Sequence, residues 1–323
     1  MWGNKAGWTI SALIVAVFVG AMYFLQTVGM SASEMTPKFA AEAGNMQPLS
    51  LPTAPESIVS MTDDCDAAPA YRQAIQEYQD HKFDYDTKPG STVAKLTAAD
   101  KLVEATHCRK LTLFSSEPKQ VMNFDSEIEP IAALQKIGIL TVNRALALNL
   151  DKDYPGATKY AEAAFALGAK MFNERVRFDE MEAGLGLMGS AGTVLMKVAT
   201  AQGDSGRAEQ LKKFDDARKA YAGRDGPLQD LRIITRNIDG KTSGSRAGDV
   251  FWLAQKSPER MWRIEACFQL ARMTHNVGDD GHASDQRNAQ KILRRLADTE
   301  TDPLVKAAAT RARDMTDAEY NKQ

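Results

Sequence analysis

Residues 153–172 read DYPGATKYAEAAFALGAKMF, and this stretch decides the fold. Its small and apolar side chains recur every three or four residues, whereas Lys159, Glu162 and Lys170 fall outside that face. This period is typical of an amphipathic α-helix that buries one side. Because the same pattern returns along the chain after Asp66, and alternating β-type runs are nearly absent, the sequence predicts an all-α body.

Other segments with the helical period flank this one and carry helix-start signals. Ser257 followed by Pro258 fits an N-cap and a first helical position, and 302–303 repeats the signal as Asp-Pro. The predicted helices cover residues 67–82, 97–109, 127–150, 157–173, 178–201, 206–222, 227–236, 258–275, 284–297 and 303–314. Their connections are mostly short, so successive helices are expected to pair as a stack of antiparallel hairpins.

One turn between predicted helices has a recognisable pattern, formed by Asp153-Tyr154-Pro155-Gly156-Ala157 and then Tyr160, Ala163, Ala164 and Leu167. It resembles the turn and second helix of a tetratricopeptide repeat, and 203–208 and 278–283 resemble two further turns of this kind. The resemblance implies a TPR-like α-solenoid with a concave surface that binds proteins or peptides and has no chemistry of its own. No residue matches a peptide-clamp position.

The most apolar stretch lies at the N-terminus, where Trp8–Met30 reads WTISALIVAVFVGAMYFLQTVGM. About 23 residues in an α-helix span roughly 34 Å, enough to cross a hydrocarbon core of about 30 Å. The sequence therefore predicts a transmembrane helix that contacts the lipid bilayer through residues 8–30. Lys5 precedes the span and Glu34 follows it, so the positive-inside rule puts the N-terminus in the cytoplasm and the body outside the inner membrane, in the periplasm.

Small residues in and after this segment each allow two interpretations. Residues 31–33, Ser-Ala-Ser, resemble the cleavage site of a secretory signal, but the apolar stretch exceeds the usual h-region of about 7 to 15 residues, which favours an uncleaved anchor. Ala12, Ala16 and Gly20 recur every fourth residue on one helix face. They fit either the ordinary composition of a membrane helix or a face on which another helix packs closely.

These patterns divide the chain into three parts. Residues 1–33 are expected to form the cytoplasmic N-terminus and anchor, residues 34–64 a stalk or linker, and residues 65–323 the exported helical domain. The stalk is predicted from a segment without sustained periodicity that contains several prolines. These prolines are Pro37, Pro48, Pro52 and Pro55.

The three cysteines, Cys65, Cys108 and Cys267, suggest one disulfide in an exported body. Cys65 lies just before the first predicted helix of the body and Cys108 at the end of the second, so we predict that these two pair. Cys267 falls on the apolar face of its helix, where a small buried side chain is expected.

Composition and charge exclude several classes of protein. The chain has 44% hydrophobic and 25% charged residues, unlike a disordered tail or a multi-span transporter. Its 40 basic and 42 acidic residues give a net charge of -2. Because duplex nucleic-acid binders need a strong positive field, nucleic acid is not expected as a partner.

A search for chemical motifs nominates no catalytic, metal or cofactor residue. Residues 184–189 satisfy G-x-G-x-x-G, but no strand precedes them, so a close helix contact is the preferred interpretation. Gly240-Lys241-Thr242 lacks the first glycine of a P-loop. The polar cluster Asp279, Asp280, His282 and Asp285 lacks EF-hand spacing, which favours a solvated turn over a cation site.

An irregular, glycine-rich region at 223–249 interrupts the series of helices. It contains four basic residues, Arg232, Arg236, Lys241 and Arg246. The region fits either a contact loop for an acidic partner or lipid headgroups, or a solvated insertion.

Together these features predict a membrane-anchored, non-catalytic interaction scaffold, or an accessory subunit that meets other membrane or envelope proteins. Two alternatives stay open, namely a membrane-tethered enzyme that acts on an envelope substrate and an exported ligand-binding module released by signal cleavage. A pocket that gathers ionisable groups with shifted pKa values would favour the enzyme.

Overall fold

The computed structural model describes residues 35, 37–82, 97–116, 118, 122, 128–222, 247–275 and 283–320. These residues are mostly helical, as the sequence predicted. The predicted anchor at 8–30, with Ala12, Ala16 and Gly20, lies outside the described residues, as do Arg232, Arg236, Lys241 and Arg246.

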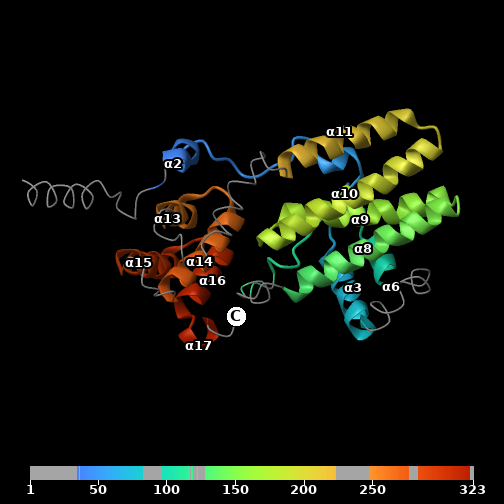
Figure 1. Ribbon diagram of the computed structural model, residues 1–323. Helices are drawn as coiled ribbons and strands as arrows, with labels where there is room; N and C mark the ends of the chain where they lie inside the picture. Colours follow the sequence, from blue (N-terminus) through green and yellow to red (C-terminus); the bar gives the residue numbers. More distant parts are fainter. Residues whose placement is uncertain are drawn as a thin grey trace, which may run out of the picture.

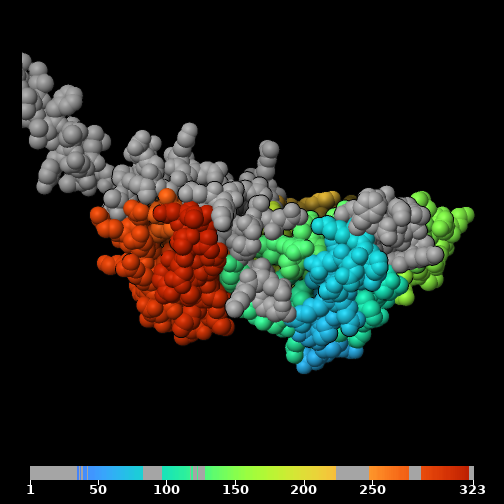
Figure 2. Space-filling view, turned by 90° about the horizontal axis from the view of Figure 1, so that it is seen from below, coloured from blue at the N-terminus to red at the C-terminus, as the bar shows by residue number. Residues whose placement is uncertain are grey.

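The helices form two groups that are joined end to end along the molecule (Figure 1). The first helix group consists of α3 (Ala68–Asp80), α6 (Thr97–Glu104), α8 (Glu129–Leu150), α9 (Tyr154–Glu174), α10 (Phe178–Ala201) and α11 (Ser205–Ala222). The second helix group consists of α13 (Ala247–Lys256), α14 (Arg260–His275), α15 (Ala283–Thr299), α16 (Pro303–Asp314) and α17 (Asp317–Tyr320). Figure 2 shows the second group, in orange and red, beside the blue-green helices of the first.

Local signals explain where α9 begins. The Asp153 side chain accepts a hydrogen bond from the Gly156 backbone N–H at 3.0 Å, which satisfies one of the donors that a helix start leaves unpaired. Helix α9 therefore starts at Tyr154, three residues before the predicted start. It ends before Arg175, which has a φ of 22°, a left-handed value that stops the helix.

The glycine motif at 184–189 lies inside α10, where it makes a close helix contact and no phosphate loop. A Cβ atom placed on Gly184 would lie 2.6 Å from the Gly168 carbonyl oxygen and 2.8 Å from the Phe172 backbone nitrogen of α9. A Cβ on Gly168 would meet the Gly184 oxygen at 2.6 Å in return. Two facing glycines thus let the backbones of α9 and α10 touch in the centre of the core.

A short parallel ladder departs from the all-α prediction. Strand β1 (Asp63–Asp66) pairs with β2 (Cys108–Lys110), so the predicted helix at 97–109 ends at Glu104. The two cysteines of this ladder, Cys65 and Cys108, lie 2.09 Å apart at their sulfurs, and the predicted pairing is confirmed. Cys267 is free and buried, as expected.

The segment predicted as a stalk packs on the body over its described residues. It contains α2 (Pro37–Ala43) and the 3-10 turn η1 (Pro55–Ser57), and Figure 1 shows α2 beside α13. Phe39, Val59 and Met61 are all less than 7% exposed. Proline content and lack of periodicity predicted a linker, but apolar side chains at irregular spacing bury this segment against helices that are distant in sequence. We call residues 37–61 the N-terminal strap.

Among the described residues, one helix is long and apolar enough to cross a membrane by length and composition. This helix is α8, and half of its most apolar 18-residue stretch is buried inside the body. A core helix of a soluble domain has the same length and composition. Helix α8 is therefore no evidence for or against the predicted anchor at residues 8–30.

Candidate functional site

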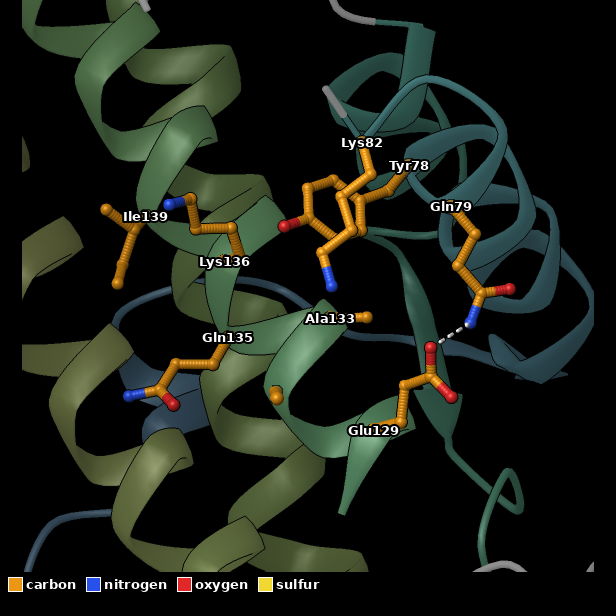
Figure 3. Close-up of a pocket in the computed structure, with 9 residues that line it drawn as sticks. Tyr78, Gln79, Lys82, Glu129, Ala133, Gln135, Lys136 and Ile139 are labelled. Atoms are coloured by element: carbon orange, nitrogen blue, oxygen red, sulfur yellow. Dashed lines mark hydrogen bonds between the residues drawn. The ribbon is translucent and has the colours of Figure 1, made fainter. Parts of the chain in front are cut away.

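A groove of about 640 Å³ opens between α3 and α8 (Figure 3). Its volume is within the usual range for small-molecule pockets, about 300–1,000 Å³. The residues that line it are Tyr78, Gln79, Lys82, Glu129, Ala132, Ala133, Gln135, Lys136 and Ile139. We call this surface the α3–α8 groove.

The groove combines an apolar patch with polar side chains that come from both helices. Gln79 Nε2 donates a hydrogen bond to Glu129 Oε1 at 3.3 Å and so links one edge of α3 to the start of α8. Ile139 is 42% exposed, and only Leu150 joins it as an exposed large hydrophobic residue in the described part of the chain. A smaller cavity of about 230 Å³ between α8 and α10 shares Ala132 and Gln135 with the groove. The hollow surface therefore continues across α8.

Buried ionisable groups lie elsewhere, inside the helix packing. Lys170 was expected outside the apolar face of its helix, yet it is only 1% exposed because α6, α8 and α10 enclose α9. Its ammonium donates to the carbonyl oxygens of Ala105 and Thr106, each at 3.1 Å, and lies 5.8 Å from the Tyr71 ring. Burial disfavours the charged form and lowers the pKa of Lys170 to about 7.

This buried lysine predicts a specific dependence of stability on pH. Between the folded pKa of about 7 and the ordinary lysine pKa of 10.5, the unfolded chain binds more protons, so the free energy of unfolding rises with pH in that interval. We expect Lys170→Met to flatten this rise by about 2 kcal/mol between pH 7.5 and 9.5. Urea unfolding of both proteins at several pH values measures the difference, and parallel pH profiles would contradict a buried, neutralised Lys170.

Two buried carboxyl groups flank the turn between α9 and α10. Glu174 accepts hydrogen bonds from the backbone N–H groups of Phe114 and Ser115 at 2.9 and 2.7 Å. Glu180 accepts one from the Val176 N–H at 2.7 Å. Burial raises the pKa of Glu174 and raises that of Glu180 well above its ordinary range, with repulsion from Glu174 as a further cause for Glu180.

The same turn carries one buried and one partly buried ion pair that join the two helix groups. Arg177 Nε donates to Glu265 Oε1 of α14 at 2.8 Å, and its guanidinium lies 4.4 Å from the centre of the Phe268 ring. Arg175 pairs with Glu259 at 3.1 Å. None of the residues with burial-shifted pKa values described above lines the α3–α8 groove, so these groups lie in the helix packing and do not face that surface.

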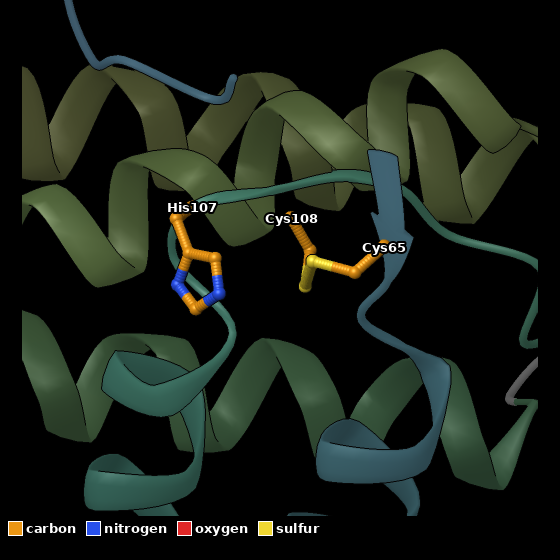
Figure 4. A group of neighbouring side chains, drawn as sticks. All are labelled: Cys65, His107 and Cys108. Carbon is orange, nitrogen blue, oxygen red and sulfur yellow. A yellow bond between two sulfur atoms is a disulfide. The ribbon is translucent and has the colours of Figure 1, made fainter. Parts of the chain in front are cut away.

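A third cluster brings together Cys65, His107 and Cys108, whose donor atoms lie within 4.8 Å of one another (Figure 4). Thiolates are the sulfur ligands that zinc requires, and the disulfide occupies both sulfur atoms. His107 Nε2 lies 3.7 Å from an Asp63 carboxylate oxygen. With the bond intact, these residues offer a histidine and a carboxylate, which is fewer ligands than a structural zinc site uses.

Sequence reasoning did not identify the groove. Its residues come from α3 and α8, which are separated along the chain, and the apolar run around Ile139 reads as core in the sequence. Of the predicted polar cluster, Asp285 is described, and it is 5% exposed at the start of α15 rather than solvated.

No protein-family model, curated protein or solved structure matches this chain. The tetratricopeptide resemblance therefore depends on the sequence of the turns and of the helix that follows the first of them, and it stays a prediction.

Proposed function

We propose that this protein is a membrane-anchored, non-catalytic interaction scaffold or accessory subunit, whose exported helical domain binds other membrane or envelope proteins. In this proposal Trp8–Met30 anchors the chain in the inner membrane, with the N-terminus in the cytoplasm and the helical domain in the periplasm. The disulfide between Cys65 and Cys108 fits an oxidising compartment.

The α3–α8 groove carries this proposal. It presents Ile139 to solvent among the amide and charged side chains of Gln135, Lys136 and Glu129. An apolar anchor position with a polar rim is the arrangement that protein interfaces use.

The arrangement of α8, α9, α10 and α11 supports a TPR-like stack of antiparallel hairpins. Consecutive members of this series pack against each other and lie side by side in Figure 1. The connections at 151–153, 175–177 and 202–204 are too short for a crossover, so each helix reverses the direction of the last. Such stacks bind partners through an extended surface made by several helices.

A pair of substitutions on one helix tests the role of the groove. Ile139→Lys places a charge in the groove, and Leu150→Lys places the same charge on the same helix outside it, where the side chain is 77% exposed. We expect recovery of stoichiometric companions from gently solubilised membranes to fall at least tenfold for Ile139→Lys and to stay unchanged for Leu150→Lys. Equal recovery with both variants would remove the groove from the proposal.

A further inference from the structure

The N-terminal strap is held at Leu49 through its backbone. The Leu49 N–H donates to Glu259 Oε2 at 3.0 Å, and Arg175 Nη2 donates to the Leu49 carbonyl oxygen at 2.8 Å. Both polar backbone groups of this residue are therefore bound by the side chains of one ion pair. Arg175 comes from the turn after α9 and Glu259 from the turn before α14, so Leu49 lies where the two helix groups meet.

The ion pair between Arg175 and Glu259 is also held in place by hydrogen bonds that do not involve the strap. Arg175 Nε and Nη2 donate to the two oxygens of Glu259, each at 3.1 Å, and Arg175 Nη1 donates to the Phe172 carbonyl oxygen at 2.8 Å. The Glu259 side chain is 5% exposed and that of Arg175 is 14% exposed. Charge-assisted hydrogen bonds at such sheltered positions are about twice as strong as neutral ones.

A second fixed point lies nearer to the N-terminus. Phe39 of α2 is 6% exposed and meets the Trp252 ring of α13 edge-on, with ring centres 5.6 Å apart. Between Phe39 and Leu49, Ser257 Oγ reaches the Met46 sulfur at 3.8 Å. The strap is thus bound at several positions to α13, to the turn between α13 and α14 and, through Arg175, to the turn between α9 and α10.

These contacts determine how far the body can move from a membrane. From Met30, the end of the proposed anchor, to Phe39 the chain can extend at most about 30 Å. Without the contacts of residues 39–49, the chain from Met30 to Pro55, the next buried residue of the strap, could extend about 85 Å. Docking of the strap therefore removes most of the distance by which the tether could separate the body from the membrane.

We infer that the α13–α14 surface is an intramolecular docking site for residues 39–49, which holds the second helix group close to the bilayer surface. When the strap is docked, the tether is short and the body stays near the lipid. When residues 39–49 are released, the tether lengthens as far as Pro55, the next buried residue of the strap, and the body can reach partners farther from the membrane. This inference depends on the anchor in the proposed function.

Leu49→Pro tests the docking because proline has no backbone N–H and loses the hydrogen bond to Glu259. Leu49→Ala is the matched control, since it shortens the side chain and keeps the N–H. Phe39→Ser removes the ring contact with Trp252, with Ala40→Ser at the neighbouring exposed position as its control. All four changes lie on the strap, outside the two helix groups.

The full chain, reconstituted in lipid vesicles, carries a donor dye at Gln290→Cys on the exposed side of α15, and the bilayer contains an acceptor lipid. We expect energy transfer to be high for the unchanged strap, Leu49→Ala and Ala40→Ser, and to fall at least twofold for Leu49→Pro and Phe39→Ser. Equal transfer in all five proteins would overturn the docking. Protein that does not float with the vesicles would instead contradict the anchor and the proposed function. If Leu49→Pro does not fold, Phe39→Ser gives the result.

Discussion

Loss of the disulfide between Cys65 and Cys108 is expected to lower the free energy of unfolding by about 4 kcal/mol. The bond closes a loop with a sequence separation of 43 residues, and it restricts the unfolded chain over that length. It also joins β1 to β2, where Cys108 is buried, so the two strands gain their stability from packing as well as from the bond.

Urea unfolding of Cys65→Ser/Cys108→Ser beside the unchanged protein measures this loss. A dithiol reductant is the control, because it should bring the unchanged protein to the stability of the double variant and leave the variant unaffected. If reductant leaves the midpoint of the unchanged protein where it was, the disulfide has no stabilising role. Cys267 stays in place in both proteins, since its thiol is buried and its pKa is raised to about 12 by burial.

Two glycines on α10 are expected to respond in opposite directions to the same substitution. Gly184→Ala places a methyl group 2.6 Å from the Gly168 backbone oxygen, so α9 and α10 must move apart, at a cost of about 2–3 kcal/mol. Gly186→Ala meets no atom within 4 Å. It is expected to stabilise the helix by about 0.5–1 kcal/mol, because alanine loses less backbone entropy than glycine.

The two positions lie two residues apart on the same helix, so the difference in helix propensity between glycine and alanine cancels in their comparison. Thermal or urea unfolding gives the difference in free energy directly. Equal destabilisation by both variants would mean that the backbone contact between α9 and α10 does not limit the packing. A loss with Gly184→Ala that Gly168→Ala reproduces would support a contact made from both sides.

Helix positions were predicted well where the signals are local. The end of α10 at Ala201 and the span of α16 from Pro303 to Asp314 match the sequence pattern, because caps, prolines and apolar periods act within a few residues. The disulfide could also be predicted, since it follows from a count of cysteines and their place between helices. The anchor, its topology and the basic loop stay predictions.

The candidate groove and the docked strap could not be predicted in this way. The groove needs the spacing of α3 and α8, and the strap needs an ion pair between Arg175 and Glu259, which are far apart in the chain. Lys170 illustrates the same limit. Its place outside the apolar face predicted exposure, but the neighbours of α9 bury it from every side.

The sequence by itself determined the helical class, the bounds of most helices and the partner of Cys65, because these depend on residues close in the chain or on simple counts. Tertiary structure decided which surface stays hollow, which charges are buried and where the N-terminal segment lies. Those properties arise from contacts between residues that are distant along the chain. Their energies come from desolvation and close packing, which no local pattern of residues records.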